Sequence, residues 1–146
     1  MVTTILGSCL AVTMFNKRLK LGAICHGILP ESMKNDLKGL EYKEKFKYVD
    51  FAILKMLEVL RKYNIENNEI IVKVFGGSDM FSVEYYNVQN KSVGKQNVAV
   101  ALRLLKEENL KVSASDVAGS SGRIIIFYTD TGEIFLKRVI NINKML

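Results

Sequence analysis

The feature that most constrains the fold is a change of hydrophobic period along the chain. Three short apolar runs separated by turn residues come first: Val2–Leu6, Leu10–Phe15 and Leu21–Leu29. Their length and β-branched content predict strands. From Tyr42 to Tyr63 the apolar side chains instead recur every three or four residues, which predicts one long amphipathic helix. A chain that carries both periods is expected to pack helices against a sheet.

The rest of the chain extends this pattern. The polar stretch Glu31–Leu40 predicts a loop, and Val93–Glu108 predicts a second helix. Further strands are expected over four segments: Ile70–Phe75, Leu110–Asp116, Arg123–Thr129 and Glu133–Val139. Asp130-Thr131-Gly132 predicts a hairpin turn between the last two. We therefore expect a single α/β domain over residues 1–146, in which helices cover a largely β core.

Charge and cysteine content limit the classes of function. The net charge of +6 favours acidic partners, but the lysines between Lys34 and Lys47 alternate with Asp36, Glu41 and Glu44. A solvated basic surface is thus favoured over a nucleic-acid site. Two cysteines are too few for a disulfide framework, and neither a basic leader nor a membrane-length apolar run is seen. These features predict a cytoplasmic protein with reduced thiols and no membrane insertion.

Cys9 is the first candidate for chemistry, because Gly7-Ser8-Cys9 forms a turn between two predicted strands. A nucleophile at such a turn is exposed at the edge of a rigid sheet, beside backbone N–H groups that can bind a developing oxyanion. The alternative is that Cys9 is a small buried hydrophobe, which is the commoner role of a free cysteine.

His26, the only histidine, lies in a neighbouring apolar run and can act as a base near neutral pH. A cysteine and a histidine on adjacent strands suffice for thiolate chemistry, although a core histidine bonded to a backbone carbonyl would look the same in sequence. Cys25 should point to the opposite face and belong to the core. A hydroxyl from Thr3 or Thr4 is suited to orient the imidazole, but threonine is also common in strands.

Two glycine-rich turns follow strands, at Phe75–Phe81 and Asp116–Arg123. Paired glycines permit a positive φ or close backbone approach. The first turn lacks the Lys-Ser/Thr of a phosphate-binding loop. With one histidine and two cysteines in the chain, we expect no metal site and no cofactor.

Together these segments resemble the CheD family of chemoreceptor-modifying proteins. Five blocks carry the resemblance in the same order: Thr3–Val12 (TTILGSCLAV), His26 with Leu29-Pro30, Val74–Phe81 (VFGGSDMF), Val93–Val98 (VGKQNV) and Asp116–Arg123 (DVAGSSGR). Each block alone is weak, whereas the ordered set covers nearly the whole chain and is specific. It favours chemistry over simple burial for Cys9 and His26.

The resemblance implies an α/β sandwich similar to the catalytic core of bacterial deamidase toxins. It also implies deamidation of glutamine side chains on the cytoplasmic part of chemoreceptors, with receptor methyl-ester hydrolysis as a side activity. The nucleophile maps to Cys9, the base to His26, and the family's threonine, six residues before the cysteine, to Thr3. A CheC-type phosphatase is the implied partner. A mainly regulatory binding module is the alternative function, and an unrelated thiol hydrolase is disfavoured by the ordered match.

Binding and oxyanion roles are assigned more broadly. The backbone at Gly7 and Ser8 is interpreted as part of the oxyanion site. A loop is expected to line the substrate site through four of its residues: Gly76, Gly77, Ser78 and Phe81. Two features depart from the family pattern. Only Met1 and Val2 precede Thr3, so that either a strand is missing or the true start lies upstream, and Ala118 replaces a glycine.

Overall fold

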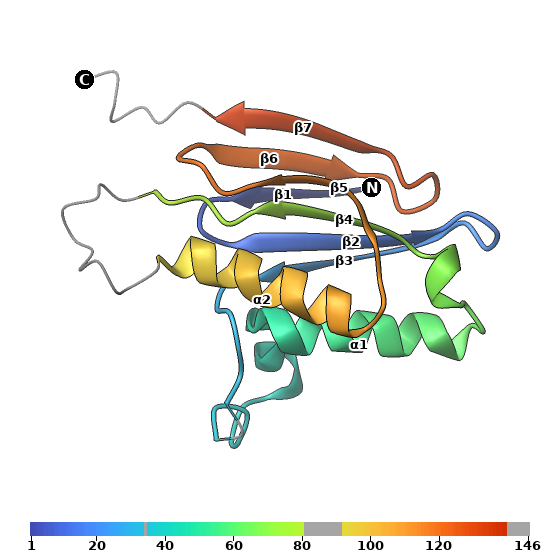
Figure 1. The fold of residues 1–146 in the computed structure, drawn as a ribbon, viewed down its shortest axis with the longest axis horizontal. Helices are drawn as coiled ribbons and strands as arrows, with labels where there is room; N and C mark the ends of the chain where they lie inside the picture. The colour runs from blue at the N-terminus through green and yellow to red at the C-terminus, as the bar shows by residue number, and fades with distance from the viewer. Residues whose placement is uncertain (34, 81–91, 140–146) are drawn as a thin grey trace.

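The computed structural model describes residues 1–33, 35–80 and 92–139 (Figure 1). Its elements follow in chain order: β1 (Val2–Leu6), β2 (Leu10–Asn16), β3 (Leu21–Gly27), η1 (Tyr42–Lys47), α1 (Val49–Lys62), η2 (Asn67–Glu69), β4 (Ile71–Gly76), α2 (Val93–Glu107), β5 (Val112–Val117), β6 (Gly122–Phe127) and β7 (Ile134–Val139). Every predicted strand is present, with ends shifted by no more than two residues, and the predicted hairpin joins β6 to β7.

The described strands form two stacked sheets. A three-stranded antiparallel sheet has the order β1-β6-β7, and a four-stranded sheet has the order β3-β2-β4-β5, with β4 and β5 parallel. The sheets meet through a small apolar core of Leu6, Ala11, Phe75 and Ile125. β1 and β3 are both edge strands. The predicted α/β sandwich is therefore confirmed.

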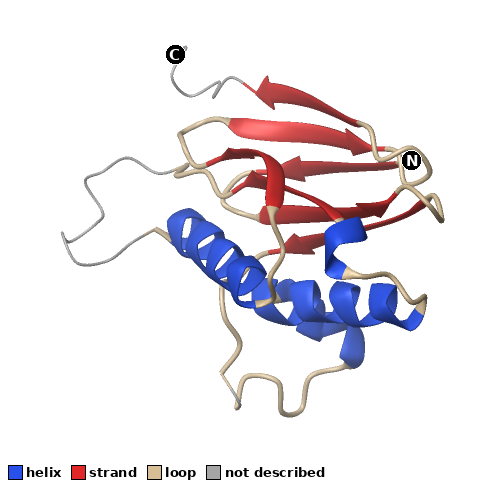
Figure 2. Ribbon diagram, turned by 45° about the vertical axis from the view of Figure 1, so that its right-hand side comes forward, coloured by secondary structure: helices blue, strands red, loops and turns tan. Residues whose placement is uncertain are grey.

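Helices α1 and α2 pack on the far face of the four-stranded sheet, so the layers run sheet, sheet, helices (Figure 2). The larger core lies here, with Val12, Val72 and Val74 from the strands beneath Ile53 and Leu57 of α1. Burying one such side chain contributes about 1.5–3 kcal/mol, so this layer supplies much of the folding free energy.

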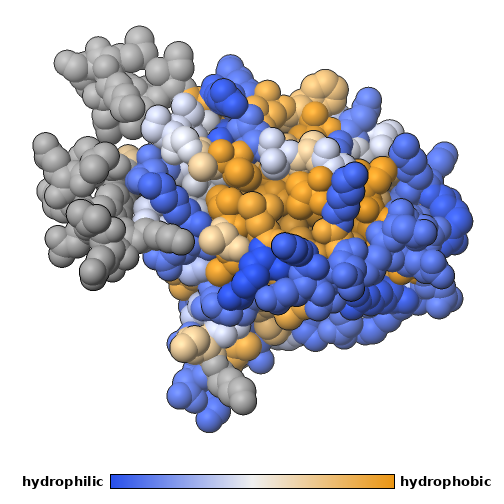
Figure 3. Space-filling model, in the orientation of Figure 1, coloured by the Kyte–Doolittle hydropathy of each residue, from blue (hydrophilic) through white to orange (hydrophobic). Residues whose placement is uncertain are grey.

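The described helices cover this face, and in the same part of the chain none packs on the outer face of the three-stranded sheet. On the outer face of the three-stranded sheet, Ile5 is 69% exposed and Phe135 is 57% exposed. In the view of Figure 3 the hydrophobic colour gathers over the sheets, and hydrophilic residues dominate over the helices below them. None of the described helices is both long and apolar enough to cross a membrane.

The prediction of a single helix from Tyr42 to Tyr63 is wrong at Tyr48, where the helix is interrupted. The chain forms a 3-10 helix, η1, then extends at Tyr48 (φ −87°, ψ 127°) before α1 begins. The cause is long-range pairing: Tyr48 bridges to Leu29, and the Val49 N–H donates to the Leu29 carbonyl at 2.8 Å. This tertiary pairing outweighs the local helical preference. It also anchors the chain that leaves β3.

Candidate active site

The turn that carries Cys9 joins β1 to β2, which lie in different sheets. Two hydrogen bonds from the residues that follow β4 hold this turn in place. The Ser78 N–H donates to the Gly7 carbonyl at 2.9 Å, and the Gly77 N–H donates to the Cys9 carbonyl at 2.8 Å. In the described part of the chain, the N–H groups of Ser8 and Cys9 have no backbone acceptor. Backbone donors that have no backbone acceptor and lie beside a thiol are suited to bind an oxyanion.

Gly76 and Gly77 make this fastening possible. Their φ angles are +102° and +66°, in the region that favours glycine. A Cβ at Gly76 would collide with the carbonyl oxygen of Cys9, and one at Gly77 would collide with the Val98 side chain. Both properties expected of paired glycines, positive φ and close backbone approach, are thus present. Because the Gly77 and Ser78 N–H groups already hold the turn, they are not available as oxyanion donors.

His26 and Cys9 face the same side of the four-stranded sheet. His26 pairs with Ala11, which lies in the core between the sheets, and Cys9 precedes Ala11 by two residues and packs against that same core. The two side chains are thus diagonal neighbours across paired strands, a relation that long side chains can bridge. Among the described residues, no hydrogen bond joins Cys9 to His26. In this structure the thiol is therefore not hydrogen-bonded to the imidazole.

The imidazole of His26 is held from the opposite sheet by Thr4. Thr4 Oγ1 lies 2.7 Å from His26 Nδ1. In the tautomer whose Nδ1–H donates to this hydroxyl oxygen, Nε2 is the ring nitrogen that can serve as a base. The partner expected from the family pattern was Thr3. The structure corrects that position, because Thr3 pairs with Ile126 on the outer face of the sheet, whereas Thr4 pairs with the fully buried Ile125.

Cys25 has the core role predicted for it. It pairs with Val12 and lies in the core beneath the helices, at 8% exposure. Burial raises the pKa of its thiol to about 12. Cys25 therefore stays protonated and unreactive at neutral pH, which leaves Cys9 as the candidate thiol.

Burial acts on both members of the candidate pair. It raises the pKa of the Cys9 thiol, an effect only partly opposed by the backbone N–H of Cys9. His26 is exposed by its surface area, and partial desolvation of its ring lowers its pKa. Both directions favour a neutral thiol beside a neutral imidazole over a resting ion pair.

Ser78 does not reach the surface. It is fully buried, its hydroxyl donates to the Ser121 carbonyl at 2.5 Å, and it accepts from Arg123 Nη1 at 2.6 Å. Arg123, only 3% exposed, also bonds to Asp116. The side chain of Ser78 therefore fixes the glycine-rich turns to each other and does not line a substrate site. The predicted contact from Phe81 lies outside the described residues.

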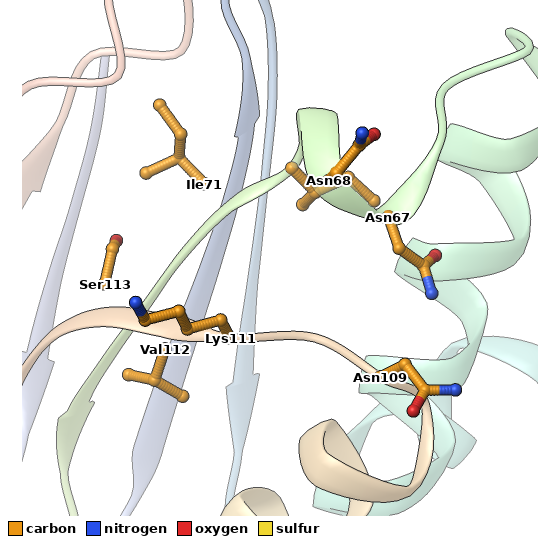
Figure 4. A pocket seen from close by; sticks show the side chains of 8 residues that line it. Asn67, Asn68, Ile71, Asn109, Lys111, Val112 and Ser113 are labelled. Atoms are coloured by element: carbon orange, nitrogen blue, oxygen red, sulfur yellow. The ribbon is translucent and has the colours of Figure 1, made fainter.

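The apolar surface beside the turn comes from Met80, whose side chain would lie 3.5 Å from a Cβ at Gly7. A separate cavity of about 670 Å³ lies at the start of β4, and its lining includes Asn67, Asn68, Asn109 and Lys111 (Figure 4). β4 runs from that cavity at Ile71 to the Cys9 turn at Gly76, so the two are at opposite ends of the strand. Across the described residues, no cluster of three His, Cys, Asp or Glu side chains could hold a metal ion.

A family model described as CheD chemotactic sensory transduction matches residues 28–138. The chain belongs to the CheD family. Sequence resemblance alone had indicated this family, and the match confirms it.

Curated CheD relatives extend the similarity over most of the chain. "Probable chemoreceptor glutamine deamidase CheD 2" of Geobacter sulfurreducens is 43% identical over 138 residues, which cover 94% of this chain and 79% of the relative. The "Probable chemoreceptor glutamine deamidase CheD" of Maridesulfovibrio salexigens is 36% identical over 143 residues, covering 94% and 82%. The protein of the same name from Thermococcus kodakarensis is 33% identical over 138 residues, covering 93% and 81%.

Proposed function

We propose that this chain deamidates glutamine side chains of chemoreceptors, with Cys9 as nucleophile and His26 as general base. The observation that carries the proposal is the shared orientation of Cys9 and His26 at one end of the sandwich, with His26 held by Thr4. The names of the CheD relatives support the substrate class. The proposed substrate is the receptor's cytoplasmic part, so the proposed place of action is the cytoplasm.

The first half of the reaction releases ammonia. His26 Nε2 takes the thiol proton as Cys9 Sγ attacks the glutamine side-chain carbonyl carbon, forming a C–S bond and an oxyanion. The N–H groups of Ser8 and Cys9, which have no backbone acceptor among the described residues, bind that oxyanion. Collapse of the intermediate breaks the C–N bond, and His26 returns the proton to the leaving ammonia. A thioester to Cys9 remains.

The second half restores the enzyme. His26 takes a proton from water as the water oxygen attacks the thioester carbonyl, and collapse breaks the C–S bond as His26 returns that proton to the Cys9 sulfur. The products are a glutamate side chain and the Cys9 thiol. A receptor glutamyl methyl ester presents the same carbonyl with methanol as the leaving group, so methyl-ester hydrolysis is a proposed side activity of the same site.

The orienting role in this scheme belongs to Thr4 and not to Thr3. With Nδ1 engaged by the Thr4 hydroxyl, the ring presents Nε2 to the thiol. Every proton that moves is carried by a side chain of this chain or by water. The scheme therefore requires no cofactor.

A partnership with a CheC-type phosphatase is proposed from the family resemblance. Binding of a phosphatase and release of ammonia are measured separately, so each proposal can stand or fall without the other. Co-elution of the two purified proteins tests it directly. A chain that binds the phosphatase but releases no ammonia would favour the regulatory role over catalysis.

The deciding experiment measures ammonia release from a purified chemoreceptor cytoplasmic fragment by the protein and by two cysteine variants. Cys9→Ala should abolish release, and mass spectrometry should locate the converted glutamines only with active enzyme. Cys25→Ala makes the same substitution at the cysteine in the core beneath the helices, and this variant should still release ammonia. If the parent protein and Cys9→Ala released equal amounts of ammonia, catalysis at Cys9 would be excluded.

A further inference from the structure

Asn97 is a buried polar side chain to which the proposed reaction has so far given no role. It lies on α2, is 0% exposed, and its amide donates two hydrogen bonds. Asn97 Nδ2 lies 2.9 Å from the Ser8 carbonyl oxygen and 3.1 Å from the Ile28 carbonyl oxygen. Both partners are acceptors, so the orientation of the amide group is determined by them.

These two carbonyls belong to the two halves of the candidate site. Ser8 directly precedes the nucleophile Cys9, and Ile28 follows His26 by two residues just beyond the end of β3. One amide group therefore ties the nucleophile turn to the strand end that carries the base. The sequence places Asn97 69 residues from Ile28 and 89 from Ser8, so only the packing of α2 brings them together.

The bond to Ser8 also fixes the direction of a catalytic N–H. The Ser8 carbonyl and the Cys9 N–H belong to one planar trans peptide unit, in which C=O and N–H point in opposite directions. With the carbonyl held toward Asn97, the Cys9 N–H must point away from α2. That N–H has no backbone acceptor among the described residues.

The oxygen of the same amide group carries a cost in stability. Asn97 Oδ1 is buried and has no hydrogen-bond partner in the described residues. An unsatisfied buried acceptor costs about 1–3 kcal/mol, so a well-packed apolar side chain would avoid this penalty. A buried group with this cost calls for a reason beyond packing.

The helix is built to bring Asn97 to this point. A Cβ at Gly94, one turn earlier, would collide with the Ser78 carbonyl oxygen, so the first turn of α2 lies directly on the Gly76–Ser78 segment. Gly94 and Asn97 share the buried face of α2. This close contact fixes how near Asn97 lies to the Cys9 turn.

We infer that Asn97 is a positioning residue of the reaction, which orients the Ser8–Cys9 peptide so that the Cys9 N–H serves as an oxyanion donor. The inference rests on the proposed function of Cys9. An oxyanion donor acts mainly in the transition state, and losing one costs about 10²–10³ in kcat. Attack of the Cys9 thiolate on a small alkylating reagent forms no oxyanion and does not need that donor.

The test compares Asn97→Leu with Asn16→Leu on the full chain. Asn16 is also buried, at 1% exposure, and its Nδ2 donates to the Glu69 carbonyl, but it lies at the other end of β2. Three quantities are measured: kcat and KM for ammonia release from the receptor fragment, the rate of Cys9 alkylation by iodoacetamide, and the unfolding midpoint. Asn16→Leu controls for the loss of a buried amide.

For Asn97→Leu we expect kcat to fall about 10²-fold, with KM and the alkylation rate each within about threefold of the parent. Asn16→Leu should lower the unfolding midpoint and leave kcat unchanged. A parallel fall of kcat and alkylation in Asn97→Leu, or an unchanged kcat, would overturn the positioning role alone. If the parent protein releases no more ammonia than Cys9→Ala, the proposed function fails and the inference fails with it.

Discussion

Thr4 on β1 and His26 on β3 are joined across the two sheets by a hydrogen bond of 2.7 Å between Oγ1 and Nδ1. These strands are the edge strands of separate sheets, so the bond exists only because the sheets stack in this register. Imidazole orientation is thereby coupled to the sandwich itself. Cys9 lies on the connection between the same two sheets, which places all three side chains at one end of the fold.

Thr4→Val and Thr3→Val form a matched pair that tests this bond. Valine has the shape of threonine without the hydroxyl, so Thr4→Val frees the ring of His26 with little change in packing. We expect Thr4→Val to lower kcat by at least about tenfold, a part of the 10²–10⁴-fold that a general base contributes. Thr3→Val should retain the parent kcat, because Thr3 faces outward. Equal kcat values for both variants would remove Thr4 from the mechanism.

The sequence could not distinguish the two threonines. The buried face of a strand can be predicted from sequence only where apolar and polar residues alternate. Here Thr3-Thr4 is followed by two apolar residues, Ile5 and Leu6. Leu6 is fully buried whereas Ile5 is 69% exposed on the uncovered face of the sheet. Nothing local records which apolar residue faces the core, so the face of Thr4 is set by tertiary packing.

Features determined locally were predicted well, and those determined by distant contacts were not. Short β-branched runs gave the strands, and the position of Cys25 next to His26 gave its core role through alternation. The break at Tyr48 required knowledge of its pairing with Leu29. Asn97 belonged to a recognised sequence block, but its partners are 69 and 89 residues away.

The protonation states of Cys9 and His26 give a prediction on pH. Burial raises the pKa of the Cys9 thiol above 9.0 and lowers the pKa of His26 below 6.5. The rate of Cys9 alkylation by iodoacetamide should therefore keep rising beyond pH 9, because only the thiolate reacts. Deamidation should instead rise through an apparent pKa below 6.5, where His26 becomes neutral, and be level at neutral pH. Alkylation that is already level at pH 7 would indicate a resting ion pair.

Asp116 is predicted to stabilise the glycine-rich turns. Its carboxylate accepts from the buried Arg123 at 2.5 Å and from Arg138 at 2.6 Å. Asp116→Asn should lower the free energy of unfolding by about 2 kcal/mol, less than the 3–5 kcal/mol of a fully buried pair because Asp116 retains solvent contact. Urea unfolding measures this difference. The exposed pair Glu58–Lys55 offers a control, and Glu58→Gln should unfold at nearly the parent urea concentration.

The same carboxylate predicts an acid dependence. Burial alone would raise the pKa of Asp116, but hydrogen bonds from Arg138 and Arg123 outweigh it and hold the pKa below the usual 3.8. A depressed pKa in the folded state means that the stabilisation is present above pH 3.8 and is lost as pH falls through the folded value. Asp116→Asn should therefore flatten the acid limb of the stability curve. An unchanged limb would show that other carboxylates determine it.

Ala118 offers a change that should stabilise the fold. Its φ is +63°, and a left-handed backbone costs a residue with a Cβ roughly 1–2 kcal/mol. Glycine removes that strain but adds about 0.4–1 kcal/mol of unfolded-chain entropy, so Ala118→Gly should gain about 0.5–1 kcal/mol in the free energy of unfolding. The hydrogen bonds of Ala118 are made by its backbone, with Gly76 and Arg123, and survive the change. Ala99→Gly, on the exposed side of α2, is the same substitution at a helical φ and should instead lose about 1 kcal/mol. Urea unfolding of both variants should give opposite signs, and a loss in Ala118→Gly would show that the strain at this position is relieved by its surroundings.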